Sequence, residues 1–278
     1  MKLPRLQALL RRPNAIVGAT LLAVILLAAL VGTVSTPYDP IIMNFDARLL
    51  PPSLVHWLGT DEWGRDVFSR LLAGASVTIR ISLLVVLLAT SCGAVIGALT
   101  GFFGGWWSRC TMALMDALQA FPSLILALGV MAVFGPSRSG VVVALSLAYL
   151  PAVVRIVRSS VLSVREQEYI EASRVMGNSD LYTMFRHVLP NSISPIIVLA
   201  TALFGWAVLS ESELSFLGLG VPPPVSSWGG MLADSRDYFS QAPWLALAPG
   251  LSVSLTLLGI NLFGDALRDQ FDPRMKNL

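Results

Sequence analysis

Six long blocks of apolar residues dominate the sequence, each about 20 residues or more in length. At a helical rise of about 1.5 Å per residue, such a block crosses a bilayer core of roughly 30 Å. The chain is 55% hydrophobic and only 13% charged, which is too apolar for an ordinary soluble domain. The sequence therefore predicts an all-α integral membrane protein with six transmembrane helices, at about residues 14–35, 77–103, 110–134, 140–160, 193–217 and 244–264.

Positive charge is unevenly divided between the two sides of these blocks. If the N-terminus lies inside, 13 of the 19 Lys and Arg residues fall in inside segments and 5 in outside segments, and Arg80 lies near an outer span end. Because cytoplasmic loops carry the excess of basic residues, this bias places both termini in the cytoplasm. The first block is longer than the apolar part of a typical signal peptide, and no cleavage site stands out after it, so we expect it to remain a transmembrane helix.

The blocks and their charges divide the chain into five parts. We expect a cytoplasmic lead-in (1–12), a first transmembrane helix (13–35), an extracytoplasmic loop (36–75), a five-helix core (76–267) that contains a cytoplasmic loop (163–192), and a cytoplasmic tail (268–278). Within the third block, Pro122 lacks a backbone donor and is expected to kink the helix. Asp116 lies about two turns from the inner end of that block, where we expect it to reach interfacial water.

The distribution of lysine and histidine excludes several chemistries. The only lysines are Lys2 and Lys276, and neither belongs to a Gly-rich pattern that holds nucleotide phosphates, so the chain lacks a P-loop. The two histidines, His56 and His187, are predicted on opposite sides of the membrane, which rules out a shared zinc site or a nucleophile–base pair. We therefore expect a non-catalytic protein with no cofactor or metal of its own and no nucleic-acid partner.

A self-contained ion-coupled secondary carrier is one class of function that fits these spans. Such carriers usually place ionisable groups or broken helices near the bilayer centre. The candidates, Glu211 and Glu213, both fall near the outer end of the fifth block, where they either line an outer gate or are solvated at interfacial depth. Whether Asp116, Glu211 and Glu213 line a pathway stays open.

Residues 168–191 form a polar island between the fourth and fifth blocks, with the pattern of two short helices broken at Gly177. The segment reads Glu171-Ala172-Ser173, then three residues, Gly177, nine residues, and His187-Val188-Leu189-Pro190. This spacing resembles the cytoplasmic signature E-A-A-x3-G-x9-I-x-L-P of membrane subunits in binding-protein-dependent ABC importers. Ser173 stands in place of the second Ala, and His187 in place of Ile. The resemblance implies that the residues that couple the chain to an ATPase are Glu171, Ala172, Ser173, Gly177, His187, Leu189 and Pro190.

The residues of this segment fit such a role physically. Small side chains at positions 172 and 173 permit close approach of another surface. Gly177 permits the positive φ that ends a helix and turns the chain. The three polar residues that follow Gly177 are candidates to cap the next helix. Pro190 is expected to stop that helix before the fifth span.

The resemblance extends along almost the whole chain and narrows to one branch of the family. The matching motifs are His56-Trp57-Leu58-Gly59-Thr60-Asp61 with Gly64-Arg65-Asp66, the run 214–220, Trp228-Gly229, and 264–269 with Asp272-Pro273. They look like the second, or C, permease of dipeptide, oligopeptide and nickel importers. The peptide and the nickel or metal-chelate branches share these motifs. The short N-terminal tail and the run 187–191 look slightly more like the nickel permease.

This resemblance implies a type I ABC importer permease fold in the bacterial inner membrane, with both termini cytoplasmic. It further implies that the chain forms a translocation path with a second, similar permease, for di- or oligopeptides or for nickel. The expected partners are two cytoplasmic ATPase subunits, which bind the ATP and magnesium, and an extracytoplasmic solute-binding protein.

Two outer loops, 57–70 and 222–238, are predicted on the same face of the membrane. Both carry Trp, Gly and paired charges of the kind found at ordered contact surfaces. We hypothesise that they shape an outer vestibule and receive the binding protein. The candidates for docking or for an outer gate are Asp61, Arg65, Asp66, Glu211, Glu213 and Trp228. The alternative is that Arg65 and Asp66 only steady a helix start, for which Thr60 or Asp61 is the candidate cap.

Overall fold

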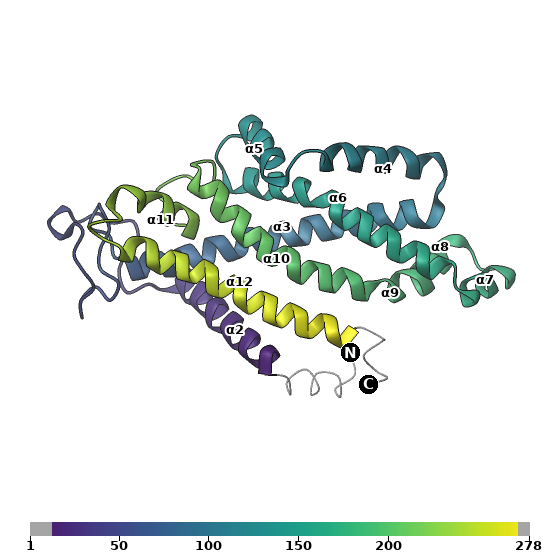
Figure 1. The fold of residues 1–278 in the computed structure, drawn as a ribbon, viewed down its shortest axis with the longest axis horizontal. Helices are drawn as coiled ribbons and strands as arrows, with labels where there is room; N and C mark the ends of the chain where they lie inside the picture. Colours follow the sequence, from purple (N-terminus) through teal and green to yellow (C-terminus); the bar gives the residue numbers. More distant parts are fainter. Residues whose placement is uncertain (1–12, 272–278) are drawn as a thin grey trace.

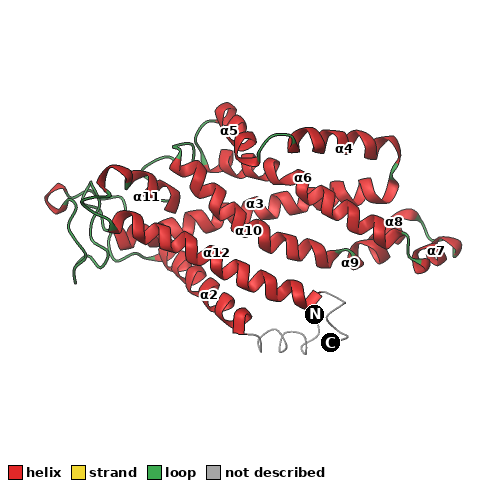
Figure 2. Cartoon of the chain, viewed as in Figure 1, coloured by secondary structure: helices red, strands yellow, loops and turns green. Residues whose placement is uncertain are grey.

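The computed structural model describes residues 13–271, which form a bundle of helices joined by loops (Figures 1 and 2). No strand occurs between residues 13 and 271, which agrees with the all-α prediction. Within this range, five helices are long and apolar enough to cross a membrane: α2 (Pro13–Val34), α3 (Val67–Phe103), α6 (Arg138–Arg165), α10 (Ile193–Phe216) and α12 (Trp244–Phe271). The expected lead-in, 1–12, and most of the expected tail lie outside the described residues.

Shorter helical elements lie in the loops at the two ends of the bundle. They are the 3-10 turn Phe45–Ala47, α7 (Glu168–Val175), α8 (Asp180–Thr183), the π-helical turn Met184–Val188, α9 (Leu189–Asn191), α11 (Trp228–Asp234) and the 3-10 turn Arg236–Tyr238. In Figure 1, α11 and the outer loop lie at one end of the long axis, and α7 and α8 lie at the other.

Helix α3 begins about ten residues earlier than the apolar pattern indicated. The expected extracytoplasmic loop, 36–75, therefore ends at Asp66, whose side chain caps α3 by accepting a hydrogen bond from the Ser69 amide. Ser69 and Arg70 lower the hydropathy of the first turn and hid it from the pattern. Both side chains are buried within the outer loop. The predicted cap at Thr60 or Asp61 is wrong for this reason.

The third span is broken into two helices. α4 (Gly105–Gln119) and α5 (Ser123–Phe134) meet at an angle of 92°, so they count as one crossing only if the break is included. Pro122 lies in this break and precedes the first residue of α5. Its ring cannot donate the hydrogen bond that would continue α4. The predicted kink at Pro122 is thus confirmed, although the change of direction is far larger than that of a kinked helix.

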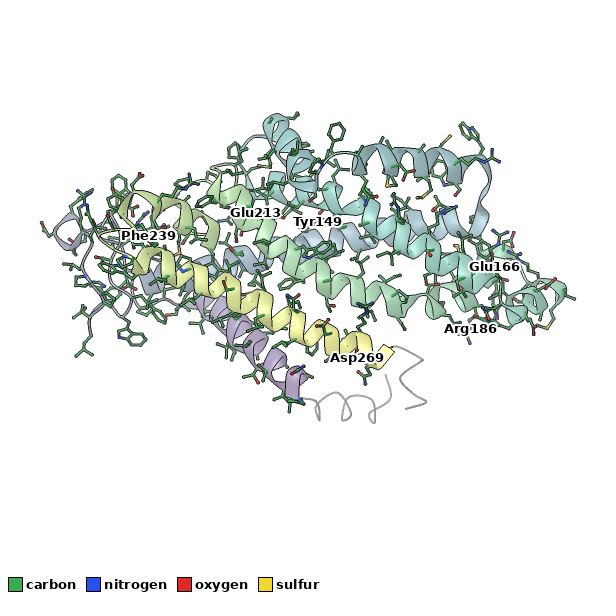
Figure 3. The ribbon with its side chains drawn as sticks, in the orientation of Figure 1. Tyr149, Glu166, Arg186, Glu213, Phe239 and Asp269 are labelled. Carbon is green, nitrogen blue, oxygen red and sulfur yellow. The ribbon has the colours of Figure 1, made fainter. Side chains whose placement is uncertain are left out.

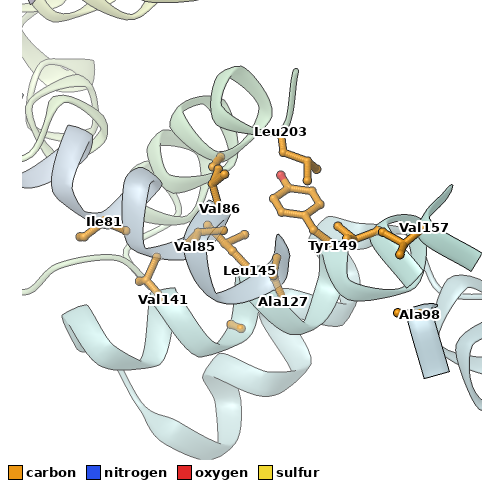
Figure 4. Packing of buried hydrophobic residues seen from close by; sticks show 14 of the residues in the cluster. Ile81, Val85, Val86, Ala98, Ala127, Val141, Leu145, Tyr149, Val157 and Leu203 are labelled. Atoms are coloured by element: carbon orange, nitrogen blue, oxygen red, sulfur yellow. The ribbon is translucent and has the colours of Figure 1, made fainter. Parts of the chain in front are cut away.

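Helices α3 and α6 form the centre of the bundle and pack with their backbones in close contact. Three glycines of α3, at positions 93, 97 and 101, face valines of α6. A Cβ atom at Gly97 would lie 2.7 Å from the Val154 carbonyl oxygen, and one at Gly101 would lie 2.9 Å from the Arg158 carbonyl oxygen. Small residues at such positions allow transmembrane helices to approach closely. Figure 4 shows the buried aliphatic side chains that fill the space around this contact.

We expect Gly97→Ala to lower the thermal stability of the purified protein because its methyl group overlaps the α6 backbone. Overpacking of this kind costs about 1–3 kcal/mol. Gly129→Ala in α5 is the matched control, because a Cβ there meets nothing within 4 Å and alanine is the better helix former. Thermal unfolding in detergent should show a lower midpoint for Gly97→Ala than for Gly129→Ala. Equal midpoints would contradict the close α3–α6 contact.

The first and last long helices pack against each other at the side of this core (Figure 1). Gly18 of α2 faces Gly259 of α12, and a Cβ at Gly18 would lie 2.8 Å from the Gly259 carbonyl oxygen. The outer end of α2 also meets α3, where the Thr33 and Ser76 hydroxyl oxygens lie 3.3 Å apart. The α2–α12 pair therefore flanks the central helices, and its outer end is joined to α3.

Candidate functional site

The cytoplasmic loop folds into the two short helices α7 and α8, beyond the inner end of α6 (Figure 1). Gly177 lies between them with a φ of 81°. A Cβ there would meet nothing within 4 Å, so glycine is favoured by the backbone conformation and not by lack of space. Ser179 caps α8 by accepting a hydrogen bond from the Tyr182 amide. The predicted turn at Gly177 and the cap that follows it are both confirmed.

Ser173 joins the two short helices. It is buried, and its hydroxyl lies 3.2 Å from Thr183 Oγ1 and accepts a hydrogen bond from Asn178 Nδ2 at 3.1 Å. Ala172 beside it is exposed. The two small side chains therefore have different surroundings, with Ser173 inside the α7–α8 contact and Ala172 at the surface. The expectation that both face an approaching partner is therefore wrong for Ser173, which holds α7 against α8.

Helix α7 is anchored to the inner end of α3. Ile170 is fully buried in the main apolar core. The guanidinium carbon of Arg174 lies 5.4 Å from the centre of the Phe102 ring, and that of Arg165 lies 6.0 Å from it. Cations over an aromatic face are attracted by its quadrupole. Phe102 is the penultimate residue of α3, so α7 contacts the inner end of a transmembrane helix.

The solvent-exposed surface of α7 and α8 is unusually apolar for a cytoplasmic loop. Glu171 and Ala172 lie on the exposed part of α7, and a polar cleft of about 520 Å³ opens beside Glu171 and Arg165. Nearby apolar side chains are largely exposed, at 83%, 75%, 57% and 63% respectively for Val175, Met176, Leu181 and Phe185. Clustered exposed apolar groups mark interaction surfaces. We call Glu171, Ala172 and these four residues the cytoplasmic docking surface.

The last part of the motif connects this surface to α10. His187 lies in the π-helical turn and packs edge-on against Tyr182, with 5.7 Å between ring centres. Leu189 packs against the apolar core, whereas Pro190 is exposed. The expectation that Pro190 stops the helix is wrong: the helical path continues to Asn191 and is interrupted at Ser192. The wider turn before it accommodates a residue without a backbone N–H group.

At the opposite end of the molecule, the outer loop is organised around Asp61. Its carboxylate accepts hydrogen bonds from the amides of Trp63 and Arg65, both at 2.9 Å, and from Arg65 Nε at 2.7 Å. Arg70 Nε lies 3.3 Å from the same carboxylate, and Arg65 Nη2 lies 3.1 Å from Glu62. Asp61, Glu62, Arg65 and Arg70 are all less than 9% exposed. We call these four residues the outer ion cluster.

The two predicted outer loops meet at this cluster. Arg70 Nη2 lies 3.3 Å from Asp234 of α11. Trp228, at the start of α11, is 2% exposed, and its indole donates to the Leu71 carbonyl at 3.1 Å. The expectation that the two loops share one face is confirmed. Trp228, however, is buried between α11 and α3 and does not form part of an outer surface.

Asp66 links the helix start to the rest of the outer loop. Besides capping α3, its carboxylate lies 2.9 Å from His56 Nδ1. His56 in turn packs against the ring of Tyr38, with 4.9 Å between ring centres. Asp61, Arg65 and Asp66 are thus all buried and engaged within the loop. This geometry favours the alternative in which they steady the local fold.

Together with Asp234, which contacts Arg70, the outer ion cluster contains three carboxyl groups and two guanidinium groups. Burial raises the pKa of the Glu62 carboxyl, and the neighbouring Asp61 carboxylate raises it further. Burial also raises the pKa of Asp234, against the opposing effect of Arg70. Three acids therefore compete for two arginines, and Asp61, which receives both guanidinium groups, is the acid that the fold holds most firmly.

The acidic residues within the spans have different surroundings. Glu211 is fully buried and accepts a hydrogen bond from Ser215 Oγ at 2.8 Å, so the expectation that it is solvated at the interface is wrong. Glu213 is half-buried and lies 3.4 Å from Ser210 Oγ, which lies 2.9 Å from the Tyr149 hydroxyl (Figure 3). These contacts form a polar connection between α6 and α10, in the outer half of α10.

Asp116 lies on α4 and is exposed, as expected for a group that reaches interfacial water. Its carboxylate forms an ion pair with Arg155 of α6 at 2.7 Å. Both side chains are more than half exposed, so solvent screens the pair and its contribution to stability is small.

Comparison with known proteins identifies the kind of protein to which this arrangement belongs. Residues 93–277 match the family described as the binding-protein-dependent transport system inner membrane component. The chain belongs to this family. Residues 6–52 also match the N-terminal transmembrane domain of oligopeptide transport permease C. The chain is therefore an ABC importer permease and a multi-pass protein of the bacterial inner membrane, and a self-contained carrier is not favoured.

Several named relatives of the permease are similar to it over nearly the whole chain. A putative peptide transport system permease of Brucella suis is 44% identical over 96% of this chain and 90% of its own length. The dipeptide transport system permease of Alkalihalophilus pseudofirmus is 40% identical over 95% of this chain and 86% of its own. The di/tripeptide transport system permease of Pseudomonas aeruginosa is 41% identical over 98% and 91%, respectively.

Solved transporter structures support the fold of the permease. A chain of the MetNI methionine ABC transporter, in an inward-facing conformation, superposes with a TM-score of 0.61, at 18% identity, over 73% of this chain and 97% of its own. A chain of an amino acid ABC transporter superposes with a TM-score of 0.55 over 75% and 94%. These likenesses support the type I permease fold expected from the sequence motifs.

Sequence reasoning missed two groups of residues in the permease. Ile170 and Phe102 anchor α7 to α3, and the four apolar residues of the cytoplasmic docking surface occupy positions that the motif leaves unspecified. An available signal was the presence of large apolar side chains inside a polar, water-facing segment. Arg70 was also missed as a member of the outer ion cluster, because its position in α3 places it next to Asp61 only after folding.

Proposed function

We propose that the permease and a second, similar permease together form the translocation path of an ATP-driven importer for di- or oligopeptides. Two cytoplasmic ATPase subunits bind the ATP and magnesium, and an extracytoplasmic binding protein delivers the solute. The permease itself is non-catalytic, which is supported by the absence of a P-loop lysine from its sequence. The peptide class is supported by the relatives, whose names refer to peptide, dipeptide, di/tripeptide or glutathione transport.

The observation that carries this proposal is the attachment of the cytoplasmic docking surface to a transmembrane helix. Exposed apolar groups of the α7–α8 pair offer a contact to an ATPase subunit. Ile170 and Arg174 hold the pair against the core and Phe102. ATP binding closes the ATPase pair, moves α7 and α8, and tilts the spans from inward-facing to outward-facing. Hydrolysis then returns the assembly to the inward-facing state.

The outer end of the permease takes a different part in this cycle. We assign Glu213, Ser210 and Tyr149 to the outer gate, because the buried Tyr149 of α6 contacts Ser210 of α10, and Ser210 and Glu213 remain partly accessible. The outer ion cluster and Trp228 keep the outer loop and α11 in place beneath the docked binding protein. Asp61, Arg65 and Asp66 support that surface from inside and do not form it.

Reconstitution tests the proposed function. The complete importer with its binding protein, in proteoliposomes, is expected to take up a labelled dipeptide only when ATP is present, and not to take up nickel ions. The permease alone should neither bind ATP nor accumulate the dipeptide under a proton gradient. Nickel uptake by the complete importer would contradict the peptide assignment. Gradient-driven uptake by the single chain would contradict the dependence on a motor.

A further inference from the structure

An open groove of about 400 Å³ lies between the outer halves of α3 and α6. Its walls are almost entirely aliphatic and include Val77, Leu84 and Val143. One arginine from each helix, Arg80 and Arg138, borders it. We call this feature the α3–α6 groove. It is separate from the cytoplasmic docking surface and from the outer ion cluster.

The packing of the two helices places both arginines at one depth. Helices α3 and α6 run in the same direction, and residues in contact across them are about 60 positions apart in sequence, as for Gly93 with Val153 and Gly101 with Val161. Figure 4 shows the same register at the outer end, where Ile81 lies beside Val141. Arg80 is therefore level with the first turn of α6, whose first residue is Arg138.

This depth corresponds to the outer surface of the membrane. The opposite end of α6 carries Arg155, Arg158 and Arg165 and is the cytoplasmic end by the distribution of positive charge. A 28-residue helix such as α6 is about 42 Å long, long enough to span the bilayer core and reach the headgroup region at each end. Arg80 and Arg138 consequently lie where phospholipid phosphate groups lie, and the aliphatic walls extend from there toward the bilayer centre.

Arg80 and Arg138 differ from the other outer arginines in having no partner among residues 13–271. Arg65 and Arg70 contact carboxylates, Arg48 donates to the Glu62 carbonyl, and Arg236 lies over the Phe216 ring. Arg80 and Arg138 are both exposed, and neither makes a hydrogen bond or ion pair to any residue of the described range 13–271. Unpaired charges at the edge of the bilayer core favour an anionic partner.

We propose that the α3–α6 groove binds an anionic phospholipid of the outer leaflet. The lipid phosphate lies between the guanidinium groups of Arg80 and Arg138, and an acyl chain follows the aliphatic walls past Leu84. The planar guanidinium group suits a phosphate, to which it donates two parallel hydrogen bonds. The aliphatic walls distinguish a lipid from a free phosphate ion, which has nothing to place against them.

Native mass spectrometry of the assembled, delipidated importer tests this proposal. We expect phosphatidylglycerol to bind at roughly tenfold lower concentration than phosphatidylcholine of the same acyl length, since each basic side chain at the surface favours an anionic lipid severalfold. The double variant Arg80→Gln/Arg138→Gln should lose this preference. Arg236→Gln is the matched control, because it removes an outer arginine that already has a partner, and it should keep the preference.

Three further results would overturn the assignment. Unchanged phosphatidylglycerol binding by Leu84→Trp, which fills the groove without altering its charge, would show that no acyl chain lies there. Competition by millimolar inorganic phosphate would indicate an ion site in place of a lipid site. Loss of the second permease from the purified double variant, with the lipid preference retained, would show that the arginines face that subunit. Leu84→Trp leaves both arginines in place, so it tests the proposal even if the double variant does not assemble.

Discussion

Replacing Gly177 with valine is expected to abolish solute uptake by the assembled importer while ATP hydrolysis continues. The residue has a φ of 81°, a conformation that a β-branched side chain adopts only at a cost of about 1–2 kcal/mol or more. Relief of that strain is expected to rotate α7 relative to α8. The α7 and α8 residues of the cytoplasmic docking surface then no longer contact the ATPase together. A shift of about 1.4 kcal/mol already changes the population of the competent arrangement roughly tenfold.

Gly177→Asn is the matched control for this experiment, since asparagine tolerates a positive φ far better than valine does. It should retain most of the uptake. Glu171→Lys, which reverses a charge on the exposed part of α7 and leaves the turn intact, should also reduce uptake. The measurements are dipeptide uptake and phosphate release by the same proteoliposomes. Wild-type uptake in both Gly177→Val and Glu171→Lys would show that this loop does not couple the ATPases to the spans.

The second large effect is expected at the outer ion cluster. Arg65→Ala removes the guanidinium group that pairs with Asp61 and Glu62, and leaves both carboxylates buried with one arginine fewer. Breaking a buried ion pair from one side typically costs about 3–5 kcal/mol, because the remaining charge stays uncompensated. We therefore expect a large drop in the thermal stability of the assembled permease, together with loss of the ordered outer loop.

A paired measurement separates this structural role from a docking role. Binding-protein affinity, measured on the fraction of Arg65→Ala that remains folded, should match that of the wild type. Arg236→Ala serves as the control, because its guanidinium lies 3.6 Å from the centre of the Phe216 ring at an exposed site, where such a contact is worth about 0.5–1 kcal/mol. Weakened docking at unchanged stability in Arg65→Ala would instead place Arg65 in the interface with the binding protein.

The sequence was most informative where one physical requirement acts on a contiguous segment. The length of an apolar block determines whether it crosses the bilayer, so the spans were located to within seven residues at each end, apart from the early start of α3 and the break within the third span. Gly177 was predictable for a similar reason. A glycine between two helical patterns, followed by polar residues, is the local signature of a positive-φ turn and a new cap.

Features that depend on neighbours distant in sequence were harder to predict. In the sequence Glu211 has the pattern of an interfacial acid, but in the structure α3 and α11 bury it. Ser173 has the pattern of a surface residue, but it is buried beside Thr183. The 92° angle between α4 and α5 could not be predicted from the sequence either, because a proline indicates only where a helix breaks. The direction after the break depends on where α5 finds packing, and α5 packs against α6 through residues such as Ala127 and Met131.

Helix α3 is one uninterrupted helix with functional contacts at both of its ends. Its 37 residues, none of them proline, span about 55 Å from the outer ion cluster to the Phe102 ring beneath α7. Pivoting such a rod by about 5° around its middle moves the two ends by about 2.5 Å in opposite directions. In the proposed cycle, a displacement that an ATPase imposes on the inner end of α3 would move the outer end in the opposite direction. Closure inside and opening outside would then be the two results of one rotation of α3.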